Sequence, residues 1–257
     1  MDNSVAGPEP GLVSRYIRAS ITTGSHERIG PFVAGFDAHS TNPFRNYAVP
    51  DDGARPAPEE VAALVAAFVH RGRTPRLEYV PGAAVGVEPA LSAAGFTVEG
   101  RVPVLVSRPG SLPDRPAPEG IGLSLATADD SLFAAAEVQH EAYGEPAPPG
   151  EADLSRLRAT VRRGGLVALA RDLATGAAVG SGLLNGPIDG VDELAAVGVR
   201  EPYRRQGVAG ALTVFLAQAG HERGVRLVWL EAESHEQRIY RSIGFVDAAE
   251  KVWMSLH

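Results

Sequence analysis

A short basic segment in the second half of the chain has the residue types and spacing to hold a phosphate group. A predicted strand ends at Val199, a turn through Pro202 follows, and a predicted helix begins near Gly207. The first backbone N–H groups of a helix have no partner within the helix, and the helix dipole places partial positive charge there. Two arginines add charge, and the glycine lets a ligand approach the backbone closely. The predicted anion-binding residues are Arg204, Arg205, Gln206, Gly207, Val208, Ala209 and Gly210.

The elements that would position this segment alternate between strand and helix patterns. Residues 166–171 and 177–184 are apolar runs joined by a short loop ending in Thr-Gly, which predicts a hairpin. Residues 207–223 place Val208 and Leu212 on one face, which predicts an amphipathic helix. The predicted elements are a strand at 120–127, helices at 130–143 and 152–163, strands at 166–171, 177–184 and 193–199, a helix at 207–223, a strand at 225–231, a helix at 235–242 and a strand at 246–256. This order predicts a mixed α/β fold.

Two motifs at this spacing carry a resemblance to a known family. The R-x-x-G-x-A pattern (Arg204, Gly207, Ala209) behind a strand resembles the acyl-CoA pyrophosphate loop of the GCN5-related N-acetyltransferases, the GNAT family. The sequence I-Y-R-S-I-G-F at 239–245 is similar to the second signature of that family, and the resemblance covers about residue 120 to the C-terminus. It implies a GNAT-like mixed central sheet flanked by helices, with acetyl-CoA as acyl donor and direct attack by a primary amine in a ternary complex. It further implies backbone contacts to the pantetheine arm from Val197, Gly198 and Val199.

The candidate catalytic residues are Tyr240 and Glu193. Tyr240 occupies the position at which many family members keep the general acid that protonates the departing thiolate, although it also reads as a half-buried helix residue. The amine must first lose a proton, because an alkyl amine has a pKa of about 10.4 and is protonated at neutral pH. Glu193 opens the central strand and is the first candidate for the base, or else a solvated strand-end carboxylate. The alternatives for this role are Glu231, Glu233 and His235. His140 and Glu141 lie on a predicted helix that could line the acceptor pocket.

One stretch departs from the family pattern. Family members often carry an Asn at the start of the helix before the tyrosine, where it contacts the cofactor. Here the corresponding stretch is EAESHEQRIY, with acidic residues instead. The departure concerns the contacts to pantetheine rather than the fold.

An internal repeat connects the two halves of the chain. Residues 75–106 read strand, helix, Gly-Phe, strand (PRLEYV, LSAAGF, RVPVLV), and residues 225–256 repeat that order (VRLVWL, YRSIGF, KVWMSL). The alignment puts Leu91 where Tyr240 stands, so the first copy lacks the proton donor. The helix at 59–71 is entered through PAPEE, whose carboxylates would repel a diphosphate. We predict a degenerate GNAT-like half without a catalytic site at 1–108, a Pro-rich linker at 109–119 and a catalytic GNAT domain at 120–257.

Composition excludes several classes of protein. The chain is 44% hydrophobic and carries a formal net charge of -7, which argues against a nucleic-acid partner. It has no cysteine, and its seven histidines show no metal-ligand spacing, so we expect no metal. The start, MDNSVAGPEPG, lacks the pattern of a signal peptide, and no apolar run reaches about 18 residues. We therefore expect a cytoplasmic protein without a membrane partner.

Two other functions deserve comparison with acetyl transfer. A dinucleotide-dependent oxidoreductase would need G-x-G-x-x-G directly after a strand, whereas Gly207 and Gly210 follow two arginines and a turn. A non-catalytic acyl-CoA-binding or partner-binding module with the same fold stays open. The sequence leaves open which small-molecule or peptide amine is the acceptor, and whether the chain forms a homodimer.

Overall fold

The computed structural model describes residues 8–38, 40–234 and 236–257, which divide into two compact units. The first unit takes the chain up to Val104 together with Asp247–His257, and the second takes Leu105–Val246. This division differs from the predicted boundaries in two respects. The Pro-rich segment 109–119 belongs to the second unit, and the last strand of the chain belongs to the first.

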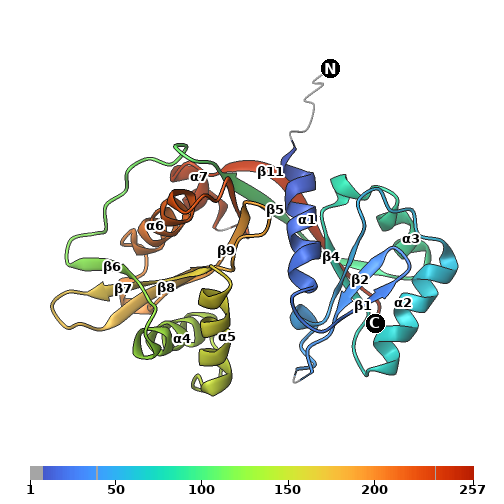
Figure 1. Ribbon diagram of the computed structural model, residues 1–257, viewed down its shortest axis with the longest axis horizontal. Helices are drawn as coiled ribbons and strands as arrows, with labels where there is room; N and C mark the ends of the chain where they lie inside the picture. Colours follow the sequence, from blue (N-terminus) through green and yellow to red (C-terminus); the bar gives the residue numbers. More distant parts are fainter. Residues whose placement is uncertain (1–7, 39, 235) are drawn as a thin grey trace. The chain divides into compact units, whose positions relative to one another are not determined.

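The second unit contains the elements that carry the predicted site (Figure 1). They are β6 (Ile121–Leu125), α4 (Asp129–Tyr143), α5 (Glu151–Arg162), β7 (Leu166–Asp172), β8 (Ala178–Leu184), β9 (Val191–Val199), the 3-10 turn η3 (Glu201–Tyr203), α6 (Val208–Glu222), β10 (Leu227–Glu231) and α7 (Gln237–Ser242). The order is the predicted one, and the predicted mixed α/β fold is confirmed. The predicted start of the last helix, His235, lies outside the described residues.

The sheet of the second unit lies between two layers of helices. Strands β6, β7, β8 and β9 pair antiparallel in that order, and β10 pairs parallel with β9. Along β7, Ala168 and Ala170 face the core that includes α6, whereas Val167 and Leu169 face the core of α4 and α5. Figure 1 shows α6 on one side of these strands and α4 and α5 on the other. Because parallel strands need a crossover, α6 connects β9 to β10 and begins just beyond the carboxyl end of β9.

The elements of the first unit include short strands as well as longer strands and helices. They are α1 (Glu9–Ile21), β1 (His26–Ile29), β2 (Phe32–Gly35), the 3-10 turn η1 (Pro43–Arg45), β3 (Ala48–Pro50), α2 (Pro58–His70), β4 (Arg76–Tyr79), the 3-10 turn η2 (Pro81–Ala83), α3 (Val87–Ala93) and most of β5 (Thr97–Ser107) and β11 (Val246–Ser255). The sequence pattern predicts α2, β4, α3 and β5, and it does not predict α1 or the three strands that follow.

The first unit repeats the element order of the second unit from α5 onward. Strands β1, β2 and β3 pair antiparallel in sequence order, as β7, β8 and β9 do. Helix α2 then leads from β3 to the parallel strand β4, as α6 leads from β9 to β10. In the aligned copies, Leu91 of α3 is fully buried and Tyr240 of α7 is 7% exposed. The tandem arrangement predicted from the internal repeat is therefore confirmed in the topology.

The last strand of the chain completes the sheet of the first unit. In the strand order β1-β2-β3-β4-β11-β5, β11 pairs antiparallel with β4, with Val252 opposite Tyr79. Lys251, the only lysine in the chain, is buried there, and its Nζ lies 2.5 Å from a carboxylate oxygen of Glu78. A strand of the second repeat copy is thus held in the first unit by backbone pairing and a buried ion pair.

Candidate active site

The loop before α6 has the backbone of an anion-binding turn. Arg205 and Gly207 both adopt left-handed conformations, with φ of 60° and 87°. Glycine takes this conformation at little cost, and such turns can direct successive N–H groups toward one side. The backbone N–H of Ala211 donates to the Gly207 carbonyl at 3.0 Å, so the hydrogen bonding of the helix starts there. The N–H groups of the preceding helical residues fall in the first turn, where an anion can accept from them.

Side chains of the loop hold it in this shape. Arg204 Nε donates to the Val199 carbonyl at 2.9 Å, which ties the loop to the end of β9. Gln206 Nε2 donates to the Pro202 carbonyl at 2.8 Å, so this side chain braces the turn. The Tyr203 hydroxyl donates to Asp172 Oδ2 at 2.8 Å, and this hydrogen bond lowers the pKa of the Asp172 carboxyl.

Strand β9 bulges where it approaches the loop. Ser181 of β8 pairs with Gly198, yet Leu183 pairs with Ala195, so β9 holds one extra residue between these pairs. Ala196 lies in this interval with a φ of 53°. A bulge of this kind bends a strand and re-aims its backbone groups. Pairing of β9 with β10 over the described residues runs from Val191 to Glu193, before the bulge.

The loop and the bulged strand line one cavity of about 880 Å³. Its lining includes every predicted cofactor-binding residue except Gln206, whose amide is engaged as described. These lining residues are Val197, Gly198, Val199, Arg204, Arg205, Gly207, Val208, Ala209 and Gly210. Val208 and Gly210 are buried, while Arg204 and Arg205 are exposed, so the arginine side chains are accessible to an incoming anion.

Tyr240 lies beside this cavity rather than in its lining. The residue is 7% exposed, and its ring meets that of Phe245 edge-on at a centroid distance of 6.3 Å. Burial, together with Glu236 and Tyr143, raises the pKa of Tyr240 above its ordinary value of 10.0. Glu236 and Tyr143 both line the cavity. The Tyr240 hydroxyl therefore keeps its proton at neutral pH and stands close to the groups that face a ligand.

Glu193 also lies outside the cavity lining. It is partly buried in β9, where Asn185 Nδ2 donates to its Oε2 at 2.8 Å. Among the other candidate bases, Glu233 lines the cavity. Glu141 lies 3.0 Å from Arg200 Nε, and His140 Nε2 lies 3.3 Å from Asp153 Oδ1. Glu231 ends β10, and His235 lies outside the described residues.

The cavity lining also contains residues that are missing from the sequence-based set, among them Arg115, Tyr143 and Glu236. Tyr143 ends α4, and its hydroxyl donates to the Val197 carbonyl at 3.4 Å. Desolvation and the nearby Glu236 carboxylate raise the pKa of Tyr143 to about 12. A tyrosine at the end of the predicted helix 130–143 is the one sequence signal that points to Tyr143. Arg115 lies in the Pro-rich segment, and no motif marks it.

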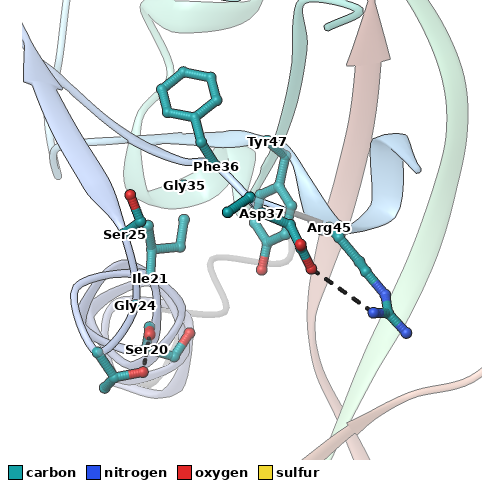
Figure 2. A pocket seen from close by; sticks show the side chains of 11 residues that line it. Ser20, Ile21, Gly24, Ser25, Gly35, Phe36, Asp37, Arg45 and Tyr47 are labelled. Carbon is teal, nitrogen blue, oxygen red and sulfur yellow. Dashed lines mark hydrogen bonds and ion pairs between the residues drawn. The ribbon is translucent and has the colours of Figure 1, made fainter. Parts of the chain in front are cut away.

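The first unit has its own, smaller cavity of about 400 Å³ (Figure 2). It lies where α1 and β2 end, and its arginine, Arg45, lies 3.7 Å from the Asp37 carboxylate. Figure 2 shows this pair apart from Ser20 and Ser25, which come from the end of α1 and the turn after it. A helix C-terminus carries partial negative charge, and the arginine here is already paired. The cavity is therefore not suited to a diphosphate.

The helix of the first unit that corresponds to α6 is closed to anions. Helix α2 begins at Pro58 with Glu59 and Glu60 in its first turn. Glu60 Oε2 accepts a hydrogen bond from the Ala57 backbone N–H at 2.8 Å. A carboxylate of the protein itself thus caps the N-terminus of α2. In the described part of the chain, the N-terminus of α6 has no such cap and lies beside Arg204 and Arg205.

Comparison with known proteins agrees with the sequence motifs. Residues 163–247 match the family model described as "Acetyltransferase (GNAT) domain". These residues span β7 to α7 and include the anion-binding loop. The chain therefore contains a GNAT domain. No curated protein sequence matches the chain.

Solved structures show the same fold over almost the whole chain. A GCN5-related N-acetyltransferase from Kribbella flavida is 25% identical with a TM-score of 0.78, covering 96% of this chain and 95% of that one. A tandem GNAT protein from the clavulanic acid biosynthesis pathway is 15% identical with a TM-score of 0.62, covering 97% and 95%. A GCN5-related N-acetyltransferase from Sphaerobacter thermophilus is 22% identical with a TM-score of 0.67, covering 88% and 76%. The fold is that of tandem GNAT acetyltransferases.

No helix in residues 8–38, 40–234 and 236–257 is long and apolar enough to cross a membrane. Within the same ranges, no three His, Asp or Glu side chains are grouped as a metal ion would require.

Proposed function

We propose that the second unit transfers an acetyl group from acetyl-CoA to a primary amine, by direct attack while both substrates are bound. The observation that carries this proposal is one cavity that joins a helix N-terminus flanked by arginines to a bulged strand. The first feature suits a diphosphate, and the second offers backbone groups to an extended arm. The match of residues 163–247 to the GNAT domain supports the same activity.

The residues of the loop fit the diphosphate of acetyl-CoA. The backbone N–H groups at the start of α6 would donate to phosphate oxygens, and Arg204 and Arg205 would add charge-assisted contacts. The backbone of Val197, Gly198 and Val199 would hold the pantetheine arm along β9. When bound, acetyl-CoA supplies the acetyl group as an activated thioester.

Proton transfer is assigned to side chains around the same cavity. Tyr240 keeps its proton at neutral pH and would donate it to the departing thiolate. The departing thiolate is the base in this step, and its conjugate thiol ordinarily has a pKa of about 8.5. Glu193 would accept the amine proton through water, with Glu233 of the cavity lining as the alternative base.

The second candidate is a module that binds acyl-CoA or a partner protein without turnover. Tyr240 and Glu193 both lie outside the cavity lining, which is the observation in its favour. The two functions differ in one measurable product, because only the enzyme releases free CoA when an amine is present.

A thiol-release assay tests the proposal directly. The protein has no cysteine, so a thiol reagent added to the reaction reports only CoA. Acetyl-CoA would be incubated with panels of small amines, amino acids and peptides, with the Gly207→Glu variant as matched control. We expect amine-dependent CoA release by the wild type alone. Binding of acetyl-CoA without release for any acceptor would favour the non-catalytic module.

A further inference from the structure

The Pro-rich segment between the two repeat copies is packed against the second unit at its first end. Ser111 carbonyl oxygen and Pro113 Cδ lie so near Gly244 that a Cβ there would meet them at 3.0 and 3.1 Å. Leu112 packs against the hydrophobic core of the second unit. A short turn fixes the approach, with the Ser111 N–H donating to the Arg108 carbonyl at 3.0 Å. The segment therefore packs against Gly244, in the Gly-Phe pair of the second signature at 239–245.

The other end of the segment is anchored beside the anion-binding loop. Pro118 Cγ lies 3.8 Å from the position of a Cβ on Gly207. The Ile121 N–H donates to the Pro118 carbonyl at 3.0 Å, and β6 begins at that residue. Residues 111–118 thus pass between the two signature motifs as a strap with both ends fixed.

Arg115 projects from this strap onto the first turn of α6. A Cβ on Gly210 would meet its Nε at 3.0 Å and its Cζ at 3.2 Å, and a Cβ on Gly207 would meet its Nη2 at 3.7 Å. The guanidinium fits there because both helix positions are glycine. Arg115 lines the same cavity as Arg204 and Arg205.

Positive charge gathers at this helix entrance, while the carboxylates of Glu233 and Glu236 line the same cavity. Cations are disfavoured at a helix N-terminus, because the dipole is positive there. Within the part of the chain that the structure describes, no carboxylate pairs with Arg115 or Arg205. Arg204 is engaged through Nε with the Val199 carbonyl, which is neutral. Three guanidinium groups around one helix entrance call for a ligand with more than one negative charge.

We propose that Arg115 is a third phosphate-binding arginine, which the interdomain strap delivers to the diphosphate of the acyl-CoA. The inference rests on the proposed function, and it places part of the cofactor site outside residues 163–247 that match the GNAT domain. The strap is then part of the binding site as well as a connection between repeat copies.

Titration calorimetry of the full chain with CoA tests this role. We expect Arg115→Gln to weaken CoA binding about tenfold, as loss of a charge-assisted contact on a half-exposed side chain should. Arg115→Lys should recover part of the loss, and raising the salt concentration should narrow the difference between Arg115→Gln and wild type. Arg108→Gln is the matched control, because Arg108 is an exposed arginine just before the Pro-rich segment and outside the cavity lining. The CoA affinity of this variant should equal that of the wild type. Thermal unfolding midpoints equal to wild type would show that each variant is folded.

A second ligand identifies the phosphate that Arg115 meets. Dephospho-CoA keeps the diphosphate and lacks the ribose phosphate, so Arg115→Gln should weaken its binding by the same factor. A loss seen with CoA and absent with dephospho-CoA would assign Arg115 to the ribose phosphate and overturn the proposal. Equal CoA affinity of Arg115→Gln and wild type would also overturn it. Absence of CoA binding by the wild type would instead overturn the proposed function itself.

Discussion

Replacing Glu78 by Gln should destabilise the first unit strongly, because this carboxylate forms ion pairs with two buried cations. Glu78 contacts both Arg76 and Lys251, and the exposed fractions of the three side chains are 7%, 0% and 5%. Arg76 also stacks on Phe44, with its Cζ 4.4 Å from the ring centroid, and its side chain is fully buried. Its Nη2 is buried and already lacks a hydrogen-bond partner among the described residues.

The size of the loss follows from leaving two like charges buried side by side. Breaking a buried ion pair by removing one partner costs about 3–5 kcal/mol. That is a large part of a typical folding free energy of about 5–15 kcal/mol. The matched control is Glu99→Gln, because Glu99 accepts from Arg76 Nε at 3.0 Å and is 26% exposed. Its replacement leaves Glu78 in place and should cost about 1 kcal/mol or less.

Urea unfolding followed by fluorescence can resolve this loss. The chain has two tryptophans, Trp253 in the first unit and Trp229 in the second, so a Trp229→Phe background reports the first unit alone. Glu78→Gln in that background should lower the urea midpoint far more than Glu99→Gln. Adding Lys251→Met should recover part of the loss, since it removes one of the two buried cations. A loss below about 1 kcal/mol for Glu78→Gln would refute the reasoning from buried charge.

The pH dependence supplies an independent check on the same cluster. Burial alone would raise the pKa of Glu78, but Lys251 and Arg76 outweigh it, and the folded-state pKa lies below the ordinary value of 4.5. A lowered folded-state pKa contributes stability that is fully present above the unfolded pKa and is lost as pH falls through the folded value. The wild type should therefore lose more stability than Glu78→Gln on acidification below pH 4.5.

Three further predictions concern the candidate site. Gly207→Glu should abolish acetyl-CoA binding in calorimetry, because Gly207 has a φ of 87° and borders the anion-binding turn, and unchanged affinity would contradict the assigned cradle. Tyr240→Phe should keep CoA binding and slow turnover at saturating acetyl-CoA by about 10² to 10⁴-fold, and an unchanged chemical step would remove Tyr240 as the acid. Titration should find one acetyl-CoA per chain, since the first unit lacks an open helix entrance, and two equivalent sites would contradict the view of a degenerate half.

The sequence predicts the second unit well because its elements are long and strongly patterned. Helix α6 spans Val208–Glu222 with a clear apolar face, and the anion-binding loop before it is contiguous in sequence. In contrast, β1, β2 and β3 have four, four and three residues, too few to show a period. Helix α1 begins with Pro and Gly in its first turns, which are typical signals of a loop.

The features that the sequence does not predict depend on contacts between residues that are distant in sequence. The pattern at 246–256 predicts a strand, but it cannot say that β11 pairs with β4 of the first unit. The sequence likewise does not predict the contacts of Arg115, which lies in a segment whose composition is typical of a linker. Its position depends on Gly244 and Gly210 leaving room for the strap, and a glycine in the sequence does not reveal what fills the space beside it. Long-range packing of this kind leaves no local signal.

The two repeat copies show that this fold does not by itself specify a phosphate site. Both place a helix between two parallel strands, and both bury an apolar helix face, with Leu64 and Phe68 of α2 as buried as Leu212 and Leu216 of α6. The difference lies at the helix entrance, where α2 caps its own N-terminus with Glu60 and α6 presents Gly207 among arginines. A carboxylate at that position satisfies the helix dipole from within the protein, whereas glycine leaves it for a ligand. Burial can therefore preserve the same frame in a copy whose helix entrance is capped by a carboxylate, so a phosphate site depends on a few residues rather than on topology.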